Sequence, residues 1–213
     1  MRRLPSRSDT NPSIADTEFG RTPLLWAAWD QRVIAVKILL ERNCVNPEAV
    51  DRCGQTPLCW AARNGDKATV GVLLERDSVN PNLAGEHGQT PLLQAARKGK
   101  KGVVKILLGR DDVDPNIASK DGQTPLSWAA RNGNEDVVKM LLARNDLNLD
   151  TTYNYGQTPT SWAANNMHDG ILKLLSDRTD SASGYAARLQ QAEPSSPKPS
   201  ESSEPPSKRI RRS

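Results

Sequence analysis

One nine-residue motif recurs along this chain at a fixed spacing. The sequence Gly-Arg-Thr-Pro-Leu-Leu-Trp-Ala-Ala begins at Gly20, and close copies begin at Gly54, Gly88, Gly122 and Gly156, each 34 residues after the one before. A fixed period of about 20 to 50 residues is typical of stacked repeats, in which each unit contacts only its neighbours. The period therefore predicts a solenoid rather than one compact core.

Each copy of the motif predicts a pair of short helices. Thr56 can accept a backbone N–H at the N-cap, and Pro57 then takes the first helical position, where its missing N–H costs nothing. Paired alanines allow close approach of helices, and Gly65 supplies the left-handed conformation that ends the first helix. In the second helix, apolar residues recur three and four positions apart, as Val138 does with Leu141 and Leu142, which indicates one buried stripe. Such short helices need their neighbours for stability.

The motif resembles the ankyrin repeat. The residues that carry this resemblance are Asp51, Gly54, Thr56, Pro57, Leu58, Ala61, Ala62 and Gly65, followed by Val70, Leu73, Leu74 and the Val79-Asn80 turn. The period is one residue longer than the usual ~33. The family's common histidine after Thr-Pro-Leu is replaced by Leu25, Cys59, Leu93, Ser127 and Ser161, so we expect its hydrogen-bond link to be weaker or absent. Trp in four of the five copies is similar to arrays found in many fungal proteins.

The resemblance implies an all-α ankyrin-repeat solenoid of stacked helix-turn-helix units with short hairpin-like turns, flanked by disordered termini. The irregular first and last repeats are expected to act as caps. The expected divisions are a disordered leader at 1–17, an ankyrin-repeat domain at 18–178 with repeats at about 18–50, 51–84, 85–118, 119–152 and 153–178, a capping helix at 179–193, and a disordered Ser/Pro-rich tail with a basic end at 194–213.

Composition and charge argue against several classes of function. Residues 18–178 contain 20 Lys or Arg against 19 Asp or Glu, only +1 of the total charge of +4, so nucleic-acid binding by the repeats is not favoured. No stretch has the length and apolarity of a membrane helix, so we expect no membrane association. Three cysteines without a recurring partner fit a reducing, intracellular environment. No catalytic, cofactor or metal motif is recognisable, and we predict a monomeric protein that is not an enzyme and uses no cofactor.

The resemblance places partner binding on the concave face, which the hairpin turns and first helices form. Carried over position by position, the expected contacts flank the motif. They are Phe19, Arg21, Trp29, Arg52, Gln55, Arg63, Asn64, His87, Gln89, Arg97, Lys98, Lys120, Gln123, Arg131, Asn132, Tyr155 and Gln157.

Two sets of recurring residues have alternative explanations. Arg63, Arg97 and Arg131 could pair with an acidic or phosphorylated peptide, or could simply be solvated at a helix C-terminus, which we favour. The repeated tryptophans could stack on a ligand, but identical placement favours packing between helices. Trp29 lies off this pattern and is expected to anchor a partner.

A basic cluster follows a Pro/Ser-rich spacer near the end of the sequence and resembles a nuclear localisation signal. Its basic residues are Lys208, Arg209, Arg211 and Arg212. The predicted function is protein–protein interaction, as an adaptor, scaffold or regulator, in the nucleus or the cytoplasm. The alternatives are a chromatin- or nucleic-acid-associated factor that uses the basic tail, and the regulatory end of a larger enzyme.

Overall fold

The computed structural model describes residues 11–149, 151 and 156–179. These residues form helices and turns without any strand, so the all-α prediction is confirmed. The chain divides into two compact units, 1–178 and 179–213, and the description below concerns the first. Its helices are α1 (Pro23–Trp29), α2 (Val33–Leu40), α3 (Pro57–Asn64), α4 (Lys67–Leu74), α5 (Pro91–Arg97), α6 (Lys101–Leu108), α7 (Pro125–Arg131), α8 (Glu135–Leu142) and α9 (Pro159–Asn165), and residues 169–179 are also helical.

The Thr-Pro pairs begin the odd-numbered helices as the sequence predicts. The Thr56 side-chain oxygen accepts a hydrogen bond from the backbone N–H of Cys59 at 3.1 Å, and the other four threonines cap their helices in the same way. Ser127 completes a reciprocal capping box at the start of α7. Each such cap stabilises a helix by about 1 kcal/mol, which matters for helices of only two turns.

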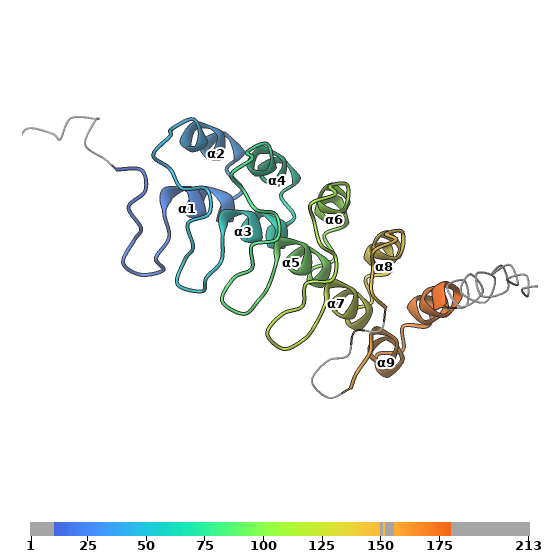
Figure 1. Cartoon of the computed structure of the whole chain (residues 1–213). Helices are drawn as coiled ribbons and strands as arrows, with labels where there is room; N and C mark the ends of the chain where they lie inside the picture. The colour runs from blue at the N-terminus through green and yellow to red at the C-terminus, as the bar shows by residue number, and fades with distance from the viewer. Residues whose placement is uncertain (1–10, 150, 152–155, 180–213) are drawn as a thin grey trace, which may run out of the picture. The chain divides into compact units, whose positions relative to one another are not determined.

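The helices pack in two layers. Helices α1, α3, α5, α7 and α9 contact one another in sequence, and α2, α4, α6 and α8 form a second row against them (Figure 1). The paired alanines of the first four units lie at the contact between layers, where Ala61 and Ala62 are fully buried, whereas Ala164 of the last unit is exposed. Val70 and Leu73 of α4 are also fully buried, as the apolar stripe predicts. The turns that precede α1, α3, α5 and α7 project from the same side of the first row.

Arginines link successive helices of the second row, a role that the sequence did not reveal. A guanidinium nitrogen of Arg110 donates to the carbonyl of Leu74, and one of Arg144 donates to that of Leu108, at 3.2 and 3.0 Å. Arg76 donates to Leu40 in the same way. The last carbonyls of an α-helix lack partners inside the helix. These arginines therefore cap the helix of the preceding unit.

Asparagines link the turns that follow the second-row helices. The Asn82 side chain accepts from the backbone N–H of Asp114 at 3.0 Å, and Asn116 accepts from Asn148 at 2.7 Å. Both amides also donate to a carbonyl of the following turn. The turns at residues 80–82 and 114–116 thus join neighbouring units.

Contacts of the first unit extend into the segment assigned to the leader. The Ser13 hydroxyl donates to the carbonyl of Cys44 at 2.7 Å, and Asp16 accepts four hydrogen bonds from the turn and α1. Folded contacts therefore begin before residue 18. Residues 1–10 and 180–213, which include most of the predicted leader, capping helix and tail, lie outside the described residues.

The residue that ends each first-row helix has a left-handed backbone. Gly65, Gly99 and Gly133 have φ values of 84°, 63° and 72°, as the sequence predicts. The corresponding residues of the two end units, Gln31 and Met167, have φ values of 60° and 57°. Unlike glycine, both carry a Cβ. A side chain in this conformation is strained, because its Cβ approaches the following carbonyl oxygen.

Met167→Gly should therefore stabilise the protein by about 1 kcal/mol. The Met167 side chain is 85% exposed, so its removal loses little packing. Chemical denaturation of the two proteins would measure the difference. Met167→Ala is the matched control, because it shortens the side chain but keeps the Cβ. Equal stability of the Gly and Ala variants would show that strain at this residue is negligible.

Candidate partner-binding surface

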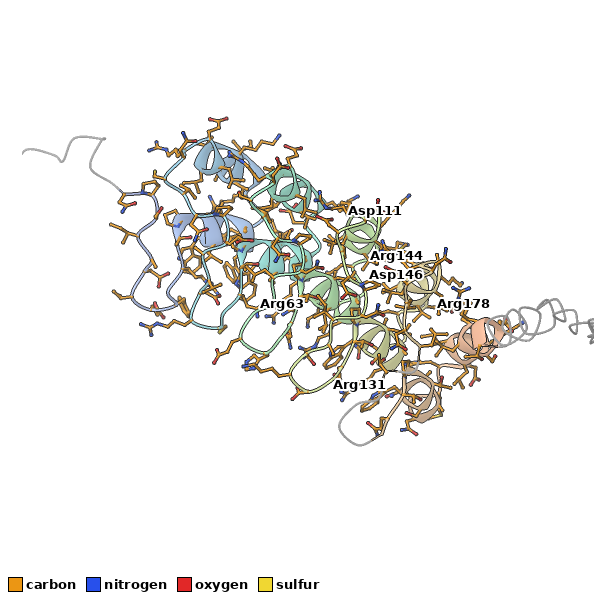
Figure 2. All side chains as sticks on the ribbon, in the orientation of Figure 1. Arg63, Asp111, Arg131, Arg144, Asp146 and Arg178 are labelled. Carbon is orange, nitrogen blue, oxygen red and sulfur yellow. The ribbon has the colours of Figure 1, made fainter. Side chains whose placement is uncertain are left out.

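The turns before the first-row helices and the C-terminal ends of these helices form one surface, here called the turn-side surface. Backbone hydrogen bonds hold adjacent turns together: the Arg52 N–H donates to the carbonyl of Phe19 at 2.9 Å, and the Lys120 N–H donates to that of His87 at 3.0 Å. Figure 2 shows Arg63 and Arg131 on the first-row side, and Arg144 beside Asp146 on the second-row side. The turns therefore present their variable residues in a regular array.

A buried carboxylate fixes the turn before α3. Asp51, only 6% exposed, accepts from the backbone N–H groups of Cys53 and Gln55, each at 2.9 Å. It also accepts from the indole N–H of Trp60 at 2.8 Å. One side chain thus closes the turn and orients the tryptophan, so Trp60 belongs to the framework.

Asp16 has the same role before α1. It accepts from the backbone N–H groups of Phe19, Arg21 and Glu18, and from the indole N–H of Trp26 at 3.0 Å. These hydrogen bonds lower the pKa of Asp16 from its ordinary 3.8 to about 2, and the bond from the Phe19 N–H has the largest effect. Because the folded-state pKa is the lower one, this stabilisation is present above about pH 4 and is lost as the pH falls towards 2.

The aspartate–tryptophan pair is absent from the α5 unit, where Gly85 and Gln94 occupy the corresponding positions. The buried Gln94 amide donates to Gln89 at 2.6 Å and to Gln55 at 3.2 Å. A Cβ added to Gly85 would lie 2.2 Å from the Gln55 amide nitrogen. The glycine thus makes room for a glutamine network that replaces the pair.

The recurring arginines lie over the faces of the tryptophans. The Arg63 guanidinium carbon is 5.0 Å from the ring centroid of Trp60, and that of Arg97 is 4.4 Å from Trp128. Arg131 lies between two rings, 5.1 Å from Trp128 and 4.4 Å from Trp162. All four distances are within the roughly 6 Å range of cation–π attraction. Each arginine thus has an internal contact that explains its recurrence without a ligand.

Arg21 lies within a cluster of four aromatic rings at the α1 end. Its guanidinium carbon is 4.7 to 5.1 Å from the centroids of Phe19, Trp26, Trp29 and Trp60. Its Nε is 3.6 Å from the Asp51 carboxylate, and its side chain is only 11% exposed. The outer rings remain accessible, because Phe19 is 41% and Trp29 39% exposed. Among the described residues, this is the most aromatic part of the turn-side surface.

The residues predicted to contact a partner differ in accessibility. Those that are exposed are Phe19, Trp29, Arg52, Arg63, His87, Lys98, Lys120 and Asn132. Those that are half-buried are Arg21, Asn64, Gln89, Arg97, Arg131 and Gln157, whereas Gln55 and Gln123 are buried. Tyr155 lies outside the described residues. The accessible part of the predicted set is therefore smaller than the sequence suggests.

Two of the predicted residues also hold neighbouring units together. The Asn64 amide donates to the carbonyl of Trp29 at 2.9 Å, and the Asn132 amide donates to that of Arg97 at 2.8 Å. Both carbonyls lie at the end of the preceding first-row helix, where they lack an intrahelical partner. The 34-residue period shows that these asparagines recur, but it does not show that their amides reach the preceding helix.

Two observations concern reactive groups and metal sites in the described part of the chain. The Cys59 thiol is fully buried, and this burial raises its pKa to about 11, which suppresses the reactive thiolate. Among the residues placed by the structure, no group of three or more His, Cys, Asp or Glu could hold a metal ion. Within the same residues, no helix is long and apolar enough to cross a bilayer.

Comparison with known families gives a consistent result. A family model described as ankyrin repeats matches the chain in three copies, at residues 3–84, 35–119 and 92–184. The matches together run from residue 3 to residue 184, which is most of the chain. A comparison with curated proteins found no match.

Proposed function

The chain belongs to the ankyrin-repeat family, and we propose that it binds a partner protein or peptide through its turn-side surface, as an adaptor, scaffold or regulator. Ankyrin repeats are generally protein–protein interaction modules, and typically they are not enzymes. The turn-side surface corresponds to the face that the family uses for binding. We further propose that this chain has no enzymatic activity of its own.

The exposed aromatic pair Phe19 and Trp29 is the observation that best supports this proposal. The recurring tryptophans are buried or half-buried, whereas Phe19 and Trp29 leave about two fifths of their surface accessible. Both rings are held in place, because Arg21 contacts each of them and Trp26 packs edge-on against each at 5.8 and 5.5 Å. Rigid, partly exposed aromatic rings are common binding hot spots.

Trp29→Ala should weaken partner binding at least tenfold, since truncating a tryptophan hot spot costs about 2 kcal/mol or more. Partners would first be identified with the wild-type protein in extracts of the native cell. Their affinities for the two proteins would then be compared by titration, with unfolding curves to verify that the fold is retained.

Ile34→Ala is the matched control, because Ile34 is an exposed apolar residue of α2, outside the turn-side surface, and is 72% exposed. Its variant should bind as the wild type does. Unchanged affinity of a folded Trp29→Ala variant would contradict the assignment of this anchor.

The alternative functions depend on segments outside the described residues or outside this sequence. Nuclear import and nucleic-acid binding by Lys208 to Arg212 stay predictions, and a tail-driven association with DNA would weaken steeply with salt. A role as the regulatory end of a larger enzyme also stays a prediction. Binding through the turn-side surface needs only one copy of the chain, in line with the predicted monomer.

A further inference from the structure

The turn between α5 and α6 carries an unusual density of positive charge. Residues 97–105 contain five basic residues and no acidic one. Four of these are lysines, and a fifth lysine lies at the start of α4. We call these five residues the lysine cluster: Lys67, Lys98, Lys100, Lys101 and Lys105. All of them are exposed except Lys100, which is half-buried.

Two of these lysines reach across the boundary between neighbouring units. A Cβ added to Gly65 would lie 2.8 Å from Cδ of Lys100, and one added to Gly102 would lie 2.7 Å from Cδ of Lys67. The two glycines therefore leave space for the aliphatic parts of the lysines. A shallow cavity of about 310 Å³ lies between them, with Lys101 also in its wall.

The neighbouring acidic residues pair with only one lysine of the cluster, among the described residues. Lys101 pairs with Asp136 at 3.3 Å, and Glu135 pairs with Lys139 at 2.7 Å. Asp66 uses its carboxylate to cap α4. Within the described residues, the other four lysines of the cluster form no salt bridge. Adjacent like charges repel each other, and an anionic ligand would relieve this repulsion.

The lysine cluster adjoins the turn-side surface at Lys98, a predicted partner contact. The three recurring arginines of that surface, at positions 63, 97 and 131, lie over tryptophan rings. The cations that remain available for a ligand are thus lysines, whose flexible stems and point charges require no fixed pairing geometry. Carboxylates on an extended chain suit such a surface.

We propose that the lysine cluster binds an acidic, Asp/Glu-rich segment of the partner. This inference rests on the proposed function and identifies the chemistry of part of the same binding surface. Neighbouring units are about 10 Å apart, a distance that roughly three residues of an extended peptide span. Double-stranded DNA is a poorer match, because residues 18–178 as a whole are nearly neutral, with 20 basic against 19 acidic residues.

The test is a titration of the full chain with a fluorescent Glu-rich decapeptide at an ionic strength of about 0.15 M, where charges more than about 8 Å apart are largely screened. The triple variant Lys98→Glu, Lys100→Glu and Lys105→Glu should bind the peptide at least tenfold more weakly, and Lys→Gln changes at the same positions should give a smaller loss. The matched control is Lys37→Glu, Arg42→Glu and Lys173→Glu, which changes the net charge equally at exposed positions elsewhere. The control should bind within about twofold of wild type.

Three results would overturn the proposal. They are the absence of peptide binding by the wild-type chain, an equal loss in the cluster and control variants, and tighter binding of a duplex DNA or a phosphopeptide that the cluster variant abolishes. Binding of the native partner by both variants distinguishes this inference from the proposed function. If Trp29→Ala loses the partner and the cluster variant keeps it, only the role of the lysine cluster is contradicted. If the cluster variant loses the partner and Trp29→Ala keeps it, the aromatic anchor is contradicted.

Discussion

Trp60→Ala should lower the free energy of unfolding by about 3 to 5 kcal/mol. The Trp60 side chain is 8% exposed, and its indole N–H donates to the buried Asp51. Its ring also contacts the guanidinium groups of Arg21 and Arg63, at 4.9 and 5.0 Å from the centroid. Truncation would create a cavity, leave a buried carboxylate oxygen without its donor and remove two cation–π contacts at once. Urea denaturation followed by circular dichroism would measure the loss.

The control for this change is Trp29→Ala, which removes an equally large ring that is 39% exposed. Its effect on stability should be clearly smaller, although it also loses a contact with Arg21. If Trp60→Ala and wild type unfolded at the same midpoint, the ring would not be part of the framework. If Trp29→Ala lowered the free energy of unfolding as much as Trp60→Ala does, exposure would not distinguish a framework tryptophan from a binding anchor.

The repeat frame could be predicted from the sequence because its causes are local. Thr56 and Pro57 start a helix, and Gly65 ends it, through interactions within a few residues of themselves. The period then places the same elements in each unit. The helix starts and the left-handed helix ends can therefore be predicted without knowing how the units stack.

The contacts between units could not be predicted in the same way. Spacing shows that Arg97 and Trp128 recur in step, but not that a guanidinium lies over the ring of the next unit. From the sequence, solvation at the helix end is the favoured explanation of these arginines. The structure adds the ring contacts. It also assigns Asp16, which the sequence places in a disordered leader, to the cap of the first turn.

The accessible part of the candidate surface was equally difficult to predict. Gln55 and Gln123 occupy turn positions that the family resemblance marks as partner contacts, yet their side chains are 5% and 4% exposed. Gln55 accepts from Gln94, whose position is occupied by tryptophan in the other units. This hydrogen bond joins residues 39 positions apart, so no local pattern reveals it.

Asp51→Ala should lower the free energy of unfolding by about 3 to 5 kcal/mol, the typical cost of removing one partner from a buried ion pair. The Asp51 side chain is 2% exposed and lies 3.6 Å from Nε of Arg21, itself almost enclosed by aromatic rings. Two backbone N–H groups and the Trp60 indole would also lose their acceptor. Equilibrium urea unfolding would measure the change.

Two controls define what the carboxylate contributes. Asp121→Ala removes an exposed carboxylate from the turn before α7 and should change the stability by less than about 0.5 kcal/mol. Asp51→Asn keeps one carbonyl oxygen as an acceptor but removes the charge opposite Arg21, so its loss should lie between the other two. A double-mutant cycle with Trp60→Phe would isolate the indole hydrogen bond. A loss below about 1 kcal/mol in Asp51→Ala would contradict the view that this side chain joins the turn to the aromatic cluster.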